Sequence, residues 1–122
     1  MKKLLIVLVL LFAATVVFGQ TIKLGTFPVG KWLDPNWDAV WEFSSNNIRI
    51  LSSTDGSVLY DFSGKTIQNF KVFVDGIQPG ISFTCPESER SYSFKASLPK
   101  TDVVMEIERS DKPKYNLTMK KQ

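Results

Sequence analysis

Side chains that could perform acid–base or nucleophilic chemistry are sparse in this sequence, and their spacing builds no reaction centre. The 122 residues contain no histidine and a single cysteine, Cys85. The commonest general base and metal ligand of proteins is therefore missing, and no pair of thiolates is available for zinc. No Gly-x-Ser-x-Gly turn holds an activated serine. We expect no enzymatic activity, no metal site and no cofactor.

Two carboxylate pairs are the remaining candidates for acid–base catalysis. Glu106 and Glu108 are spaced to share one face of a strand, and that face is the polar one. Glu87 and Glu89 fall in a predicted turn. Carboxylates in such places are ordinarily solvated charges, and we interpret both pairs in that way.

The sequence leaves two possible roles for Arg49. It alternates with Ile48 and Ile50, so its side chain either points outward from an exposed strand or reaches a barrel mouth, where it would suit an acidic headgroup. The outward orientation is favoured, because arginine is seldom buried.

The first 19 residues have the layout of a secretory signal peptide. Lys2 and Lys3 precede an apolar run over residues 4–18, and Val17 and Gly19 fit the −3 and −1 positions of signal peptidase. An uncleaved anchor is the alternative, but this run is shorter than the roughly 20 residues that a spanning helix needs. We expect cleavage at Gly19–Gln20 and a secreted or periplasmic chain without a stable membrane anchor.

Composition limits the classes of partner. The net charge of +3 includes Lys2 and Lys3 of the signal-like segment, which leaves +1 for the rest of the chain, so no nucleic-acid surface is predicted. Cys85 shares a strand face with Phe83 and is interpreted as a small buried apolar residue, with a reactive or intermolecular thiol as the alternative. The sequence identifies no protein partner. A C-terminal group of lysines is interpreted as solvated charge, with an anion-binding patch as the alternative; its members are Lys112, Lys114, Lys120 and Lys121.

Apolar and polar residues alternate along most of the chain after residue 20, which is typical of strands with one buried face. The clearest stretches are residues 91–98, 101–108 and 114–120. We expect these to place seven side chains in one interior: Tyr92, Phe94, Val103, Met105, Ile107, Tyr115 and Leu117. A further strand is expected to carry Trp37, Ala39, Trp41 and Phe43 on one face, and an opening strand is expected over residues 21–27.

Short turns with Asp-Gly or Asn-rich sequences separate these stretches, as in antiparallel hairpins. The sequence therefore predicts an all-β domain over residues 20–122, built as an up-and-down meander of eight or nine strands that closes into a small barrel. A β-sandwich is the alternative.

The segment Val29-Gly30-Lys31-Trp32-Leu33-Asp34 resembles the Gly-x-Trp opening motif of the lipocalins and related calycin barrels. The resemblance implies that Trp32, beside Gly30, packs as a plug across the closed end of a barrel, beneath a basic residue from the final strands. Arg109, Lys114 and Lys120 are the candidates for that basic residue. The chain has no room for the outer helix of full lipocalins, which points to a narrower barrel.

The predicted inward face is rich in aromatic residues. If the barrel is hollow, four of them are expected to line the cavity: Trp41, Phe43, Tyr92 and Phe94. We then expect a non-catalytic protein that binds a small apolar molecule or a lipid. The alternative is a structural or protein-interaction domain of the cell envelope whose aromatic residues fill the core.

The signal-like segment gives the first testable prediction. Because Val17 and Gly19 fit the cleavage pattern, protein recovered outside the cytoplasm should begin at Gln20 when its N-terminus is sequenced. Recovery of an intact chain beginning at Met1 in the membrane fraction would contradict this.

Overall fold

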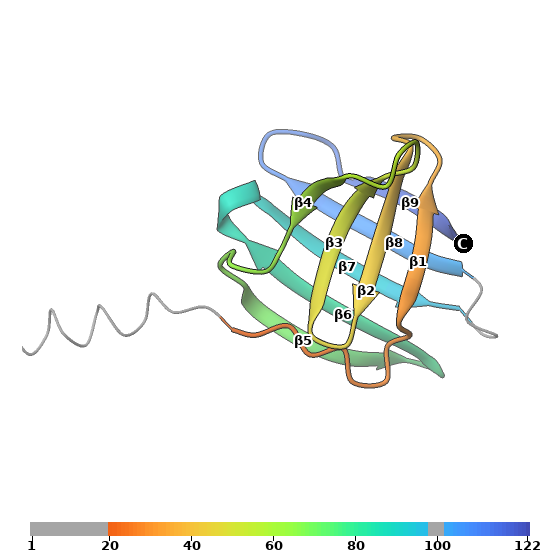
Figure 1. Cartoon of the computed structure of the whole chain (residues 1–122). Helices are drawn as coiled ribbons and strands as arrows, with labels where there is room; N and C mark the ends of the chain where they lie inside the picture. The colour runs from red at the N-terminus through yellow and green to blue at the C-terminus, as the bar shows by residue number, and fades with distance from the viewer. Residues whose placement is uncertain (1–19, 98–101) are drawn as a thin grey trace, which may run out of the picture.

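Nine antiparallel strands form one continuous sheet that curls into a half-barrel (Figure 1). This computed structural model describes residues 20–97 and 102–122, so the signal-like segment and the turn at 98–101 lie outside the described residues. The strands are β1 (Gly30–Asp34), β2 (Ala39–Ser44), β3 (Asn47–Ser52), β4 (Val58–Asp61), β5 (Gln68–Asp75), β6 (Gln78–Cys85), β7 (Arg90–Ala96), β8 (Asp102–Arg109) and β9 (Tyr115–Lys121). The predicted all-β meander is confirmed.

The described ranges contain one helical element, the short 3-10 turn η1 (Pro86–Ser88). Within these same ranges, no helix has the length and apolar character needed to span a membrane.

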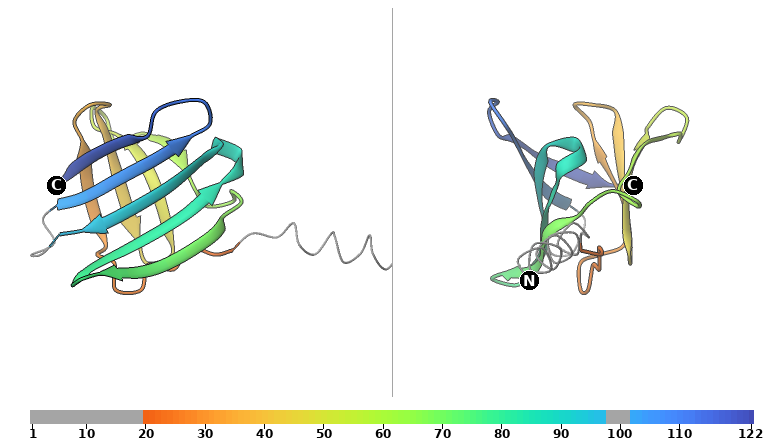
Figure 2. Two further views of the ribbon diagram at one scale, coloured as in Figure 1. Left: turned by 180° about the vertical axis from the view of Figure 1, so that it is seen from behind. Right: turned by 90° about the vertical axis from the view of Figure 1, so that its left-hand side faces the viewer.

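The strand order across the sheet is β4-β3-β2-β1-β9-β8-β7-β6-β5. Neighbours in sequence are neighbours in the sheet, with the exception of β4 and β5, which form its two edges. The first and last strands of the chain, β1 and β9, pair with each other in the middle of the sheet, with Trp32 opposite Lys121. Figure 2 shows the two halves of the sheet facing each other, β1–β4 on one side and β5–β9 on the other. All strands of the described chain belong to this one sheet, so it is not a sandwich of two separate sheets.

The opening strand expected over residues 21–27 is absent, and that prediction was wrong. The segment is irregular: Gly25 has a φ of +62°, and the following Pro28 has no N–H to donate to a strand ladder. Its apolar side chains, Ile22, Leu24 and Phe27, are nonetheless buried in the core.

This N-terminal segment crosses between the two halves of the sheet. At one end Gln20 contacts the β5 side, since its backbone N–H donates to the Ile67 carbonyl and its side-chain Oε1 accepts from the Phe70 N–H at 2.6 Å. Further along, the Leu24 N–H donates to the Ser45 carbonyl in the β2–β3 turn at 3.1 Å. The segment therefore covers one end of the half-barrel.

The interior side chains follow the predicted alternation. Tyr92, Phe94, Val103, Met105 and Ile107 belong to the buried core, and Tyr115 and Leu117 pack against it. Cys85 is fully buried, as predicted. Trp37 differs from expectation: it lies in the turn before β2 and is 69% exposed. The strand begins only at Ala39, because Asp38 adopts a φ of +49°, outside the extended region.

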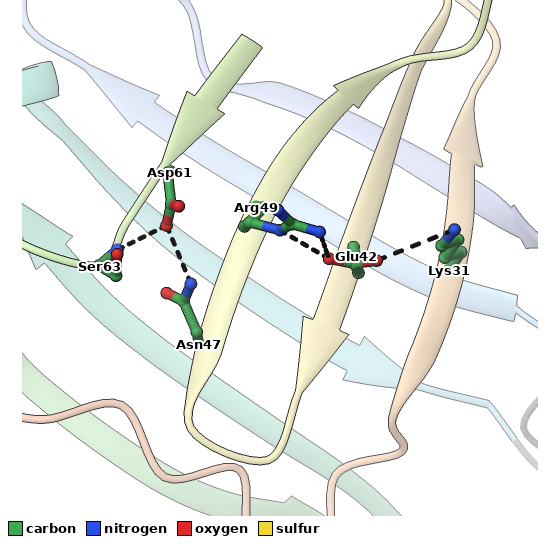
Figure 3. Close-up of polar contacts among 6 residues, drawn as sticks. All are labelled: Lys31, Glu42, Asn47, Arg49, Asp61 and Ser63. Carbon is green, nitrogen blue, oxygen red and sulfur yellow. Dashed lines mark hydrogen bonds and ion pairs between the residues drawn. The ribbon is translucent and has the colours of Figure 1, made fainter. Parts of the chain in front are cut away.

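The outer face of β1, β2 and β3 carries a cross-strand charge cluster (Figure 3). Glu42 lies opposite both Lys31 and Arg49 in register. The guanidinium of Arg49 binds Glu42 Oε1 through Nη2 at 2.6 Å, and Lys31 Nζ lies 3.8 Å from Oε2. The outward orientation of Arg49 is thus confirmed, and its charge is already paired.

A second polar contact on this face fixes the end of β4. Asp61 Oδ1 accepts hydrogen bonds from Asn47 Nδ2 and the Ser63 N–H, both at 2.9 Å (Figure 3). The bond from Asn47 lowers the pKa of Asp61 below its usual value.

Gly30 and Trp32 form a close pair at the end covered by the N-terminal segment. Trp32 is fully buried. Its ring packs edge-to-face with that of Phe43, and the two ring centroids are 5.6 Å apart. A Cβ on Gly30 would lie 3.3 Å from the indole, and the φ of +149° there favours glycine. The cation over the indole is Lys121, with Nζ 6.0 Å from the ring centroid.

The three candidates named from the resemblance lie elsewhere. Lys114 pairs with Glu106 and Glu108, Lys120 pairs with Asp102, and Arg109 hydrogen-bonds the Pro113 carbonyl.

Truncating the buried indole should strongly destabilise the fold. Trp32→Ala should lower the free energy of unfolding by about 3–5 kcal/mol, the usual cost of removing a large buried aromatic side chain. Trp37→Ala is the matched control and should cost little, because that indole is 69% exposed. Denaturant titration followed by circular dichroism measures both. Equal stabilities for the two variants would mean that Trp32 is not an essential packing residue.

Candidate ligand-binding site

The four aromatic residues predicted to line a cavity are brought together in the structure. Ring centroids are 5.3 Å apart for Trp41 and Phe94, 5.1 Å for Phe43 and Phe94, and 5.9 Å for Trp41 and Tyr92. Such separations are those of aromatic rings in direct contact. The four rings therefore pack against one another and fill the space between the two halves of the sheet.

A cleft of about 320 Å³ opens beside this aromatic cluster, between the β1–β2 turn and strands β7–β9. Its volume lies near the lower end of the roughly 300–1,000 Å³ common for small-molecule sites. Trp41 is the member of the cluster that reaches it; Phe43, Tyr92 and Phe94 are not among the described residues of its lining. The apolar lining consists of Trp37, Ala39, Trp41, Ile50 and Ile107.

The cleft lies at the end of the half-barrel that carries the β1–β2 and β8–β9 turns, at the top of Figure 1. Trp37 stands in the first of these turns and Lys112 in the second. The N-terminal segment and Trp32 close the other end. The polar lining consists of Asp34, Arg90, Arg109, Lys112 and Tyr115.

Asp34 and Tyr115 form a fixed polar wall of the cleft. Asp34 is 2% exposed, and both of its oxygens accept from the Tyr115 hydroxyl, at 3.1 and 3.0 Å. The Asn36 N–H donates to Asp34 Oδ1 at 2.9 Å, and Asn36 Nδ2 donates to the Tyr115 hydroxyl at 3.2 Å. This network ties the β1–β2 turn to β9 and gives each oxygen of the carboxylate a hydrogen-bond donor.

Arg90 and Arg109 stand on the concave side of the sheet, at the ends of β7 and β8. They are register partners, two residues beyond the inward-facing pair Tyr92 and Ile107. Side chains two apart on a strand share a face, so both arginines lie on the same side as the aromatic cluster. Arg109 Nη2 donates to the Pro113 carbonyl at 3.1 Å.

Sequence reasoning missed most of these polar residues, although the pattern contained a sign of two of them. The alternation that places Tyr92 and Ile107 inside also places Arg90 and Arg109 on the inner face. Whether Arg90 and Arg109 lie directly opposite each other depends on the register of the β7–β8 hairpin, which the sequence pattern does not predict.

Cys85 is buried and contacts two polar side chains. The thiol lies 3.7 Å from the Tyr60 hydroxyl and 3.7 Å from Glu87 Oε1, and Glu87 in turn accepts three hydrogen bonds from Thr66. In the part of the chain that the structure describes, no group of three or more Cys, Asp or Glu side chains is placed to hold a metal ion.

Tyrosine ionisation gives a pH-dependent prediction. Burial raises the pKa of Tyr60 to about 12 and raises those of Tyr92 and Tyr115 above the usual value of 10.0. These are all the tyrosines of the chain. The pKa values of these tyrosines are higher in the folded protein than in the unfolded chain. Their protonated hydroxyls therefore contribute fully to the free energy of unfolding below pH 10, and this contribution is lost as pH rises towards 12.

A spectrophotometric titration of tyrosinate measures this effect. Absorbance in the folded protein should rise at higher pH than in the protein unfolded in denaturant. A folded-state rise at or below the pH of the unfolded chain would contradict the burial of the hydroxyls.

Comparison of the chain with protein-family models, curated proteins and solved structures found no match. The nine-stranded antiparallel half-barrel is compatible with a barrel fold, and the functional conclusion depends on the geometry of the cleft.

Proposed function

We propose that the protein is a non-catalytic binding protein that holds a small, largely apolar molecule in the cleft at the open end of the half-barrel. The cleft itself carries this proposal: about 320 Å³ lined on one side by Trp37, Trp41, Ile50 and Ile107, with polar groups on the other. This combination of apolar walls and a few polar groups is typical of small-molecule sites. The ligand lies at the mouth, because the aromatic cluster occupies the interior.

The exposed indole of Trp37 supports this assignment. It is 69% exposed at the rim of the cleft, whereas the indole of Trp41 is 4% exposed at its inner end. An apolar body in the cleft would contact both and would remove the Trp37 ring from water. Burial of aromatic surface of this kind is favourable.

Export and a lipocalin-like mode of binding form part of the same proposal. The layout of residues 1–19 supports secretion or a periplasmic location. The burial of Trp32 beside Gly30, with Lys121 over its ring, supports the likeness to the lipocalins.

A structural or protein-interaction domain with a filled core is the second candidate. The direct contacts among Trp41, Phe43, Tyr92 and Phe94 favour it, since they leave no space for a ligand between those rings. The two candidates differ in whether the cleft binds a small molecule.

Titration with N-phenyl-1-naphthylamine, a neutral apolar dye whose fluorescence rises in apolar sites, tests the proposal. We expect a saturable rise with one site per chain. Trp37→Ala should weaken binding by roughly two- to tenfold, the equivalent of one aromatic contact, with thermal stability unchanged. Ile77→Ala is the matched control, because Ile77 is an exposed apolar residue outside the cleft. A folded protein that gives no saturable signal would favour the filled-core candidate.

A further inference from the structure

Two arginines face each other at the mouth of the cleft. Arg90 on β7 and Arg109 on β8 are direct register partners, and both line the cleft. Like charges placed directly opposite each other destabilise an antiparallel pair. Lys112 adds a third cation at the same end.

Several other cations in or beside the sheet form ion pairs with carboxylates. Ion pairs join Lys31 and Arg49 to Glu42, Lys95 to Asp75, Lys114 to Glu106 and Glu108, and Lys120 to Asp102. Within residues 20–97 and 102–122, no carboxylate lies within 4.0 Å of a charged nitrogen of Arg90, Arg109 or Lys112. Lys71 on β5 and Lys121 on β9 also lack an ion pair among the described residues, but they lie outside the cleft, whereas Arg90, Arg109 and Lys112 line it together.

The carboxylates around this cation group either form hydrogen bonds with other residues or lie outside the cleft. Asp34 is within the cleft, but it is 2% exposed and hydrogen-bonds Tyr115 and Asn36. Glu89 and Asp111 line a second surface depression, and Arg90 and Arg109 line that depression as well as the cleft. Neither forms an ion pair with them in the described structure.

Arg109 also has a hydrogen-bond donor without an acceptor among the described residues. Its Nε is buried and has no partner among the described residues, while Nη2 is held by the Pro113 carbonyl. A buried donor without a partner costs free energy that a ligand acceptor would recover. The planar guanidinium presents its donors in a geometry that matches an oxyanion.

From these observations we propose that the cleft selects molecules in which an apolar body carries one oxyanion, either a carboxylate or a phosphate. The oxyanion lies between Arg90 and Arg109, and the apolar body lies against Trp41 and Trp37. This inference rests on the proposed function, because it assigns the ligand class of the same cleft.

Two dyes that share one aromatic body test the selectivity. 8-Anilinonaphthalene-1-sulfonate carries an anion, and N-phenyl-1-naphthylamine is its neutral counterpart. The sulfonate should bind roughly tenfold more tightly, the factor expected from one charge-assisted hydrogen bond. Arg90→Gln and Arg109→Gln should each reduce this ratio, and the double variant should bring it close to one, because the affinity for the sulfonate falls more than the affinity for the neutral dye.

Arg49→Gln is the matched control. It removes the same charge from the outer face, where Arg49 pairs with Glu42 (Figure 3), and should leave the ratio unchanged. Competition against the bound sulfonate with decanoate, decyl phosphate and 1-decanol then separates the sources of the oxyanion. Displacement at lower concentration by one of the two anions identifies its headgroup class, and 1-decanol should displace least.

The outcomes distinguish this inference from the proposed function. If both dyes bind equally, the oxyanion assignment is overturned while the binding function stands. If neither dye binds to the folded protein, the binding function itself fails. A ratio that persists in the double variant would also overturn the assignment, since the selectivity would then arise elsewhere.

A stability measurement on the free protein supplies an independent check. Removing one of two opposed cations should relieve repulsion, so Arg90→Gln should melt at a temperature no lower than the parent. A large loss of stability would overturn the assignment of Arg90 to the oxyanion site, because its side chain would then be required by the free fold.

Discussion

Aromatic contact across the half-barrel is the interaction on which the rest of the structure depends. Phe94 on β7 touches both Trp41 and Phe43 on β2, and so joins the two halves of the sheet through their side chains. Backbone pairing between the halves is confined to β1 and β9. Without the aromatic contacts, two curved meanders of four and five strands would share one short ladder, and neither would bury its inner face.

This arrangement explains why the protein has a packed interior and a cleft at the same time. The rings fill the middle, and the N-terminal segment with Trp32 closes one end. At the other end the strands continue past the last aromatic layer, where Arg90 and Arg109 extend the inner face and Asp34 with Tyr115 supports the opposite wall. Arg109 is half-buried at this rim and Arg90 is exposed, so water and salt screen the charge of Arg109 less than that of Arg90.

Alternation predicted much of the fold, since a strand with one buried face leaves a period of two in the sequence. It placed Tyr92, Phe94 and Ile107 correctly and predicted an antiparallel meander of eight or nine strands, although β1 was not among the strands it identified. The prediction failed at two places where the local backbone conformation prevents a strand. Gly25 and Pro28 interrupt the expected opening strand, and the positive φ of Asp38 leaves Trp37 in a turn. The cleft could not be predicted, because it depends on which strand ends meet across the sheet.

The pairing of β1 with β9 has a consequence for the order of folding. Trp32 lies opposite Lys121, so this contact joins residues far apart in the sequence, whereas every other ladder connects strands adjacent in the chain. Closing so long a loop is slow relative to hairpin formation. The β1–β9 ladder can therefore form only after β9 has been synthesised, and until the two halves of the sheet meet, the apolar face of β1 and β2 is exposed to other chains.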